Sequence, residues 1–124
     1  MVRLVVSVTV LVVLLLSGAA SGHGPSGVEA SFDVETHILQ IRVFHAVRDA
    51  GQHYVNKITV ELNGKKIIEQ HFKSQVDKEH QEALFMIRDA EIGDEVEITA
   101  GCNISGKKKV SIEVIAPEPA EESS

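Results

Sequence analysis

Apolar and polar residues alternate along this chain from Val28 onward with a period close to two. That period is typical of β-strands with one buried face, whereas an amphipathic helix repeats every 3.6 residues. The stretches that carry it are Val28–Phe32, His37–Phe44, Tyr54–Leu62, Lys65–Phe72, Ala83–Arg88, Glu95–Gly101 and Lys109–Ile115. Only the polar segment Lys73–Glu82 is compatible with a helix, and it is short.

Turn residues separate these stretches. Asn63-Gly64 is the strongest two-residue hairpin signal in the chain, because both residue types tolerate positive φ. Just before it the alternation is clearest, with one predicted face made of Tyr54, Ile58, Val60 and Leu62 and the other of Lys57, Thr59 and Glu61. Further turns are predicted at Asp33–Glu35 and Ile92–Asp94, and a loop at Ala46–Gln52. Short strands at regular spacing predict an all-β fold, an immunoglobulin-like antiparallel β-sandwich of about seven strands.

The first 22 residues have the pattern of a secretory signal peptide. Arg3 is followed by an apolar run, Leu4–Leu16, and then by small residues up to Gly22. We therefore expect a periplasmic or secreted protein whose β-sandwich domain spans residues 23–115, followed by a disordered acidic tail, 116–124. Cleavage after Ala19, Ala20 or Gly22 fits equally well. An uncleaved membrane anchor is the alternative, although a span needs about 20 apolar residues.

Composition excludes several classes of partner. Removing Arg3, the only charged residue of the leader, changes the formal net charge from -6 to -7, which argues against nucleic acid and, after signal cleavage, against anionic membranes. The absence of Trp and the single Tyr argue against a stacking platform for sugars or bases. No nucleophile elbow, phosphate loop or metalloprotease motif is present.

Cys102 is the only cysteine, so an internal disulfide is excluded. If successive strands run antiparallel, His45 at the end of one strand, His53 before the next, and Cys102 after the sixth all reach the same end of the sandwich. The same count places His37 at the opposite end. His71, His80 and His23 are additional candidates at or near the cluster, and His23 becomes the N-terminus if cleavage follows Gly22.

Two imidazoles and a thiolate suit zinc, copper or iron, and disfavour calcium and magnesium, which take oxygen ligands. The alternative is purely structural. A single cysteine is most often a small buried apolar residue, and histidines at strand ends commonly bond loop carbonyls. The predicted metal ligands are His45, His53 and Cys102, with His23 as an additional candidate.

The chain also resembles a known family, the iron domain of superoxide reductases (desulfoferrodoxin and neelaredoxin). The resemblance rests on His45, His53-Tyr54-Val55, Asn63-Gly64 and Cys102-Asn103-x-x-Gly106. It implies an immunoglobulin-like sandwich with a mononuclear non-haem iron held by four histidines and one cysteine. It further implies that superoxide takes one electron at the open position, leaves as hydrogen peroxide, and that an electron-donor protein restores the iron. His45 and His53 match two of the histidines, and Cys102 matches the cysteine.

Some positions depart from the family pattern. Ser105 stands where the family has a histidine in the cysteine motif, and His45-Ala46-Val47 replaces His-Pro-Met. His23 is a loose match to the earliest family histidine. The resemblance therefore implies an iron site with an incomplete ligand set.

A second resemblance is to the Z subunit of the Sox thiosulfate-oxidation carrier. It rests on Arg48-Asp49, Asn56–Val60, Asn63-Gly64-Lys65 and Gly93-Asp94. This implies an exported, metal-free interaction domain that pairs with a partner subunit carrying substrate on a cysteine arm. That family lacks a counterpart of Cys102, so we rank it second. A homo-oligomer is compatible with either hypothesis.

Overall fold

The computed structural model describes residues 24–117. They form seven β-strands and, within this range, no helix, so no helix there is able to cross a membrane. The strands are β1 (Gly27–Asp33), β2 (Ile38–Phe44), β3 (Val55–Leu62), β4 (Lys65–His71), β5 (His80–Met86), β6 (Glu95–Cys102) and β7 (Lys107–Glu113). The predicted all-β fold is confirmed.

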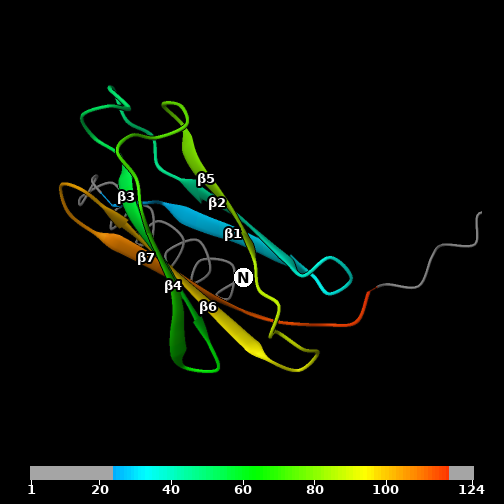
Figure 1. The fold of residues 1–124 in the computed structure, drawn as a ribbon. Coiled ribbons are helices and arrows are strands. Elements are labelled where there is room, and N and C mark those ends of the chain that lie inside the picture. The colour runs from blue at the N-terminus through cyan, green and yellow to red at the C-terminus, as the bar shows by residue number, and fades with distance from the viewer. Residues whose placement is uncertain (1–23, 118–124) are drawn as a thin grey trace, which may run out of the picture.

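The strands make two antiparallel sheets that face each other (Figure 1). One sheet has the order β1-β2-β5 and the other the order β4-β3-β6-β7, and every paired strand is antiparallel. The chain changes sheet between β2 and β3, between β4 and β5, and between β5 and β6. The antiparallel directions assumed from the sequence are therefore correct.

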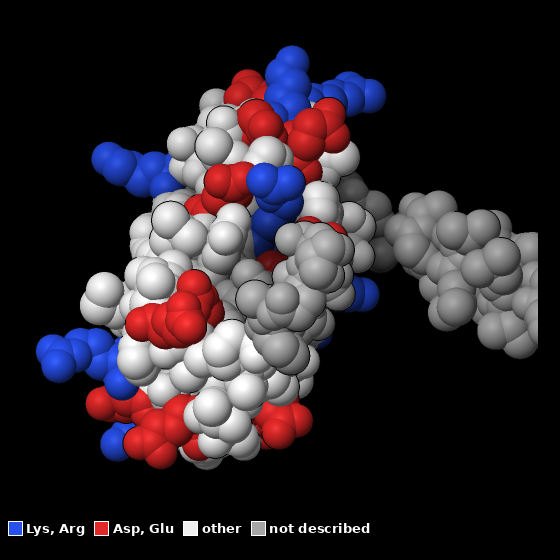
Figure 2. Space-filling view, turned by 90° about the vertical axis from the view of Figure 1, so that its right-hand side faces the viewer, with Lys and Arg blue, Asp and Glu red and all other residues white. Residues whose placement is uncertain are grey.

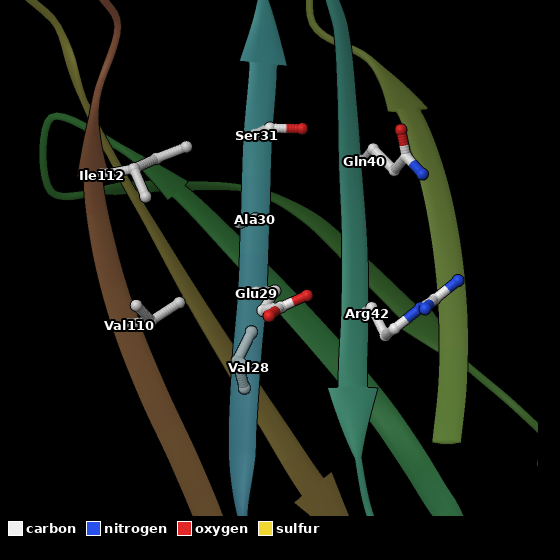
Figure 3. Close-up of a pocket in the computed structure, with 8 residues that line it drawn as sticks. All are labelled: Val28, Glu29, Ala30, Ser31, Gln40, Arg42, Val110 and Ile112. Carbon is white, nitrogen blue, oxygen red and sulfur yellow. The ribbon is translucent and has the colours of Figure 1, made fainter. Parts of the chain in front are cut away.

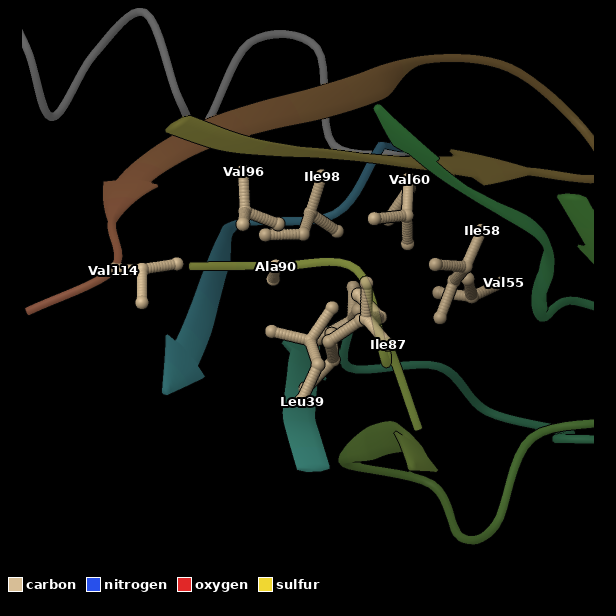
Figure 4. Close-up of a cluster of buried hydrophobic side chains, with 12 residues drawn as sticks. Leu39, Val55, Ile58, Val60, Ile87, Ala90, Val96, Ile98 and Val114 are labelled. Atoms are coloured by element: carbon tan, nitrogen blue, oxygen red, sulfur yellow. The ribbon is translucent and has the colours of Figure 1, made fainter. Parts of the chain in front are cut away.

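The core lies between the sheets and is aliphatic (Figure 4). Alternate residues of β2, β3 and β6 have no exposed surface: Leu39, Ile41, Val43, Ile58, Val60, Val96, Ile98 and Ala100. Their alternation with polar residues is what fixes the register, since a slip of one residue would turn every apolar side chain toward solvent.

A β-bulge at the start of β3 corrects one predicted face. Val55 pairs with Cys102 and Lys57 pairs with Gly101, so Asn56 is an extra residue on β3. The extra residue shifts the alternation. Val55 is therefore completely buried, whereas Tyr54, which the simple alternation placed on the inner face, is half-buried.

Other boundaries also differ from the prediction. The segment Lys73–Glu82 contains no helix; it forms turns, and β5 begins within it at His80. The last strand begins at Lys107, because its pairing with β6 continues as far as Gly101. The predicted signal peptide, 1–22, and the tail from 118 onward lie outside the described residues.

Removing the centre of the core tests this packing. We expect Ile98→Ala to lower the free energy of unfolding by about 2–5 kcal/mol, because the cavity left between two sheets cannot collapse fully. Ile115 is 62% exposed, so Ile115→Ala is the matched control and should change stability by less than about 0.5 kcal/mol. Urea denaturation of the two variants measures both values, and equal losses would contradict the assigned core.

Candidate metal centre

One end of the sandwich brings together His45, His53 and Cys102. His45 follows β2, His53 precedes β3, and Cys102 is the last residue of β6. One ligand atom from each of the three lies within 4.8 Å of the others, close enough to bind a metal ion. The predicted convergence of these three side chains is thus observed.

The two imidazoles are held against each other. Their ring centroids are 4.7 Å apart and the rings are nearly perpendicular, at 87°. His45 is the inner member, with 2% of its surface exposed, while His53 and Cys102 are partly exposed. The group is therefore open to solvent from one side and closed by the core on the other.

A buried glutamine fixes the orientation of His45. The side-chain Oε1 of Gln75 lies 2.7 Å from Nδ1 of His45 and accepts a hydrogen bond from the backbone N–H of Val55 at 2.9 Å. Its Nε2 donates to the carbonyl oxygens of His45 and Asp77, at 2.9 and 3.0 Å. These partners leave only one orientation for the amide, because a backbone N–H can only donate and a carbonyl oxygen can only accept.

This amide orientation determines the tautomer of His45. Since Oε1 of Gln75 can only accept, Nδ1 of His45 carries the proton and donates it. Nε2 then carries the lone pair of the ring and is the nitrogen able to bind a metal. Partners of this kind behind a histidine orient the ring and strengthen it as a ligand.

The loop that carries His53 is shaped by Asp49 and joined to the cysteine segment. The carbonyl oxygen of Asp49 accepts from the backbone N–H groups of Gln52 and His53, at 3.0 and 2.9 Å. Asn103 then clamps both neighbours of His53. Its Nδ2 donates to the carbonyl of Gln52 and its Oδ1 accepts from the N–H of Tyr54, each at 2.9 Å.

The turn after β6 forms hydrogen bonds with both the side chain and the backbone of Cys102. The backbone N–H of Ile104 points at Sγ of Cys102, 3.3 Å away, and the N–H of Cys102 donates to the carbonyl of Gly106 at 3.0 Å. Sγ of Cys102 also lies 3.9 Å from Oδ1 of Asn103, so the residues of this turn hold the sulfur in place. Gly106 has φ of 89°, and a Cβ on Gly24 would lie 3.1 Å from its Cα, so the turn and the start of the domain pack closely.

The other described histidines lie outside this group. His37 is in the β1–β2 turn with φ of 64°, as expected for the opposite end. His71 pairs with Glu69 at 2.9 Å, and His80 contacts Asp77 and Glu82 at 3.1 and 2.9 Å. His23 lies outside the described residues, and Ser105 is exposed in the turn.

The turn that follows Gln75 in the chain is stabilised by the ionised carboxylate of Asp77. Hydrogen bonds from the backbone N–H of Glu79, and then of His80, lower the pKa of Asp77 below its ordinary value of 3.8. A lowered pKa stabilises the turn at pH values above 3.8, and this contribution is lost as the pH falls through the folded-state pKa.

A hollow of about 650 Å³ lies away from the metal-binding group, along β1 between the edges of the two sheets (Figure 3). Its lining includes apolar Val28, Val110 and Ile112, with Glu29 and Arg42 on the outer face of the strands. Arg42 is already paired with Glu82 at 2.7 Å. None of the described residues that line this hollow is a histidine or cysteine, so they offer none of the donors that define the metal-binding group.

Comparison with known proteins gives no independent assignment: no family model matches the sequence, and no curated protein matches it significantly. The class that the fold and the side chains define is a β-sandwich domain with a His/His/Cys group able to hold one metal ion. Two further residues support the ligands: Gln75 bonds His45, and Asn103 bonds the chain on both sides of His53.

Asn103 belongs to the cysteine motif of the sequence, whereas nothing in the sequence pattern pointed to Gln75.

Gln75 can be tested against a matched residue. We expect Gln75→Leu to weaken Co²⁺ binding by about 10- to 100-fold, because His45 loses the partner that selects its tautomer. Gln81 is similarly buried and bonds the backbone of the same loop: its Nε2 donates to the carbonyls of Ser74 and Val55, and its Oε1 accepts from the N–H of Val76. Gln81→Leu is therefore the control.

Both substitutions leave buried partners unsatisfied and should lower stability by about 1–3 kcal/mol for each such group. Only Gln75→Leu should change the ¹⁵N shifts of His45 that report its tautomer. Equal losses of Co²⁺ affinity in the two variants would mean that Gln75 acts through general stability alone.

Proposed function

We propose that this protein is an exported metal-binding domain with a mononuclear iron site formed by His45, His53 and Cys102, and that it reduces superoxide. The observation that carries the proposal is the convergence of three ligand atoms within 4.8 Å at one end of the sandwich. Export follows from the signal-peptide pattern of residues 1–22.

The donor group fits a single ion. Metal–ligand bonds of about 2.0–2.3 Å place two ligands of one ion at most about 4.6 Å apart, so a small side-chain movement suffices here. His45 is oriented by Gln75, and Cys102 receives the N–H of Ile104. Three protein ligands leave positions for water or a small substrate, as in catalytic rather than closed structural sites.

Iron is favoured over zinc by the resemblance to superoxide reductases and is compatible with the donors. Imidazole suits iron, zinc and copper, and a thiolate donates electron density to a redox metal. A bound ferrous ion would supply one electron to superoxide, which takes up two protons and leaves as hydrogen peroxide. Ser105 in place of a family histidine means that the described residues offer two imidazoles and one thiolate.

The chain's own residues have separable roles in this proposal. Gln75 and Asn103 hold the His45 and His53 segments in place, and the buried side of His45 keeps water from one flank of the site. The partly exposed side, next to His53 and Cys102, is where a small anion has access. An electron-donor protein is required for turnover.

Metal analysis of the mature protein is the direct test. We expect close to one iron per chain and, on oxidation, a thiolate-to-iron charge-transfer band. Cys102→Ser should remove that band, and His45→Ala should lower the iron content at least tenfold. His71→Gln is the matched control, because His71 is an exposed histidine paired with Glu69 and lies outside the metal-binding group, and it should leave both readouts unchanged.

A mature protein that contains no metal and cannot be loaded with Fe²⁺ would overturn the proposal. Metal-free protein that instead copurifies with one partner subunit would support the interaction-domain hypothesis.

Product stoichiometry tests the reaction itself. The ferrous protein with a reductant should yield one hydrogen peroxide per superoxide consumed, because reduction uses one superoxide per product. Dismutation would yield half as much. Zinc-loaded protein is the control and should be inactive, since zinc has no redox chemistry. A ferrous protein that gives no peroxide above that control would limit the function to metal binding.

A further inference from the structure

A second hollow lies on the outer face of the four-stranded sheet, next to the candidate metal centre. Its volume is about 370 Å³, within the range of small-molecule sites. Cross-strand neighbours from β3, β6 and β7 line it in rows. The first row is Lys57, Gly101 and Lys107, and the second is Thr59, Thr99 and Lys109.

Gly101 forms the floor of this hollow, and the fold itself does not require glycine there. Its φ lies outside the left-handed region, and the nearest atom to an added Cβ would be Oδ1 of Asn56, 3.9 Å away. Glycine inside a strand costs about 0.5–1 kcal/mol relative to alanine. Such a glycine often marks the close approach of a ligand or another backbone, and no backbone atom of a described residue beyond its chain neighbours lies within 4 Å of where its Cβ would be.

The charge around the hollow is opposite to that of the protein. The chain carries a formal charge of -6, and the face drawn in Figure 2 shows carboxylates interspersed with basic groups. In the hollow, however, three lysines gather around two threonine hydroxyls.

Lys57 and Lys107 form no salt bridge with a described residue, although Lys57 is among the charges that lower the pKa of Glu69. Lys109 is offset in part by Glu97, 3.8 Å away, and the one acidic group in the lining is Glu61. The positive field is therefore strongest at the row that contains Gly101.

We propose that this hollow binds a small oxyanion carrying two or more negative charges, such as inorganic phosphate or a dicarboxylate. The anion lies over Gly101 between the ammonium groups of Lys57 and Lys107, and the hydroxyls of Thr59 and Thr99 donate to its oxygens. Lysine binds such groups as a point charge. The site does not require metal, so it stands or falls separately from the iron proposal.

The test is a titration of the metal-free protein with phosphate and, separately, with succinate, at constant ionic strength in chloride, followed by ¹H–¹⁵N NMR. We expect saturable shifts confined to β3, β6 and β7 around Gly101. The ligand that saturates at the lower concentration identifies which of the two anion types the hollow prefers.

Four variants make the assignment specific. Lys57→Gln and Lys107→Gln should each weaken binding at least about fivefold, the effect of removing one unit charge at about 4 Å in water. Glu61→Gln should strengthen it. Gly101→Thr should abolish binding by filling the floor and leave the melting temperature unchanged or higher, because the added Cβ would meet no atom closer than 3.9 Å and β-branched residues favour strands.

Lys65→Gln is the control. Lys65 is the first residue of β4 and pairs with Leu62, the last residue of β3, so it lies far along the sheet from Lys57. It should leave binding unchanged. Non-saturable shifts, or equal weakening by Lys65→Gln and Lys57→Gln, would show a general charge effect and overturn the proposal. The same titration of the metal-loaded protein distinguishes this site from anion binding at the metal.

Discussion

The antiparallel pairing of β3 with β6 is the constraint on which the rest of the structure depends. It sets Cys102 opposite Val55 and continues into a hydrogen bond from the N–H of Asn103 to the carbonyl of Tyr54. The pairing is fixed in turn by buried side chains such as Ile58 and Ile98, since any slip of register would expose them. Packing at the centre of the sandwich therefore determines where the sulfur meets the two imidazoles.

Two neutral amides link the loops around that meeting point. Gln75 links His45 to β3 and to the turn at Asp77, and Asn103 bonds the chain on both sides of His53. Gln75 is buried with its amide oxygen and nitrogen both hydrogen-bonded, so it orients His45 without the desolvation cost of a buried charge. Cys102 then contributes the sulfur atom of the group.

The two candidate sites share β6 but lie on different sides of it. Successive strand residues point to opposite faces, so Gly101 opens onto the outer hollow while Cys102 reaches the end of the sandwich. The β-bulge at Asn56 adjusts β3 opposite both residues. A single irregular stretch of the β3–β6 pair thus places the lysine-lined hollow and the metal-binding group side by side.

The sequence by itself determined the sandwich, the Asn63-Gly64 hairpin and the convergence of His45, His53 and Cys102. The strand period and the turn residues depend only on neighbouring positions in the sequence. Because the connections are short, the direction of each strand follows from the number of turns before it. Tertiary structure decided the burial of Val55, the role of Gln75 and the hollow over Gly101. These depend on distant backbone: Gln75 reaches His45 across 30 positions of the chain, and no local pattern encodes which loops fold against one another.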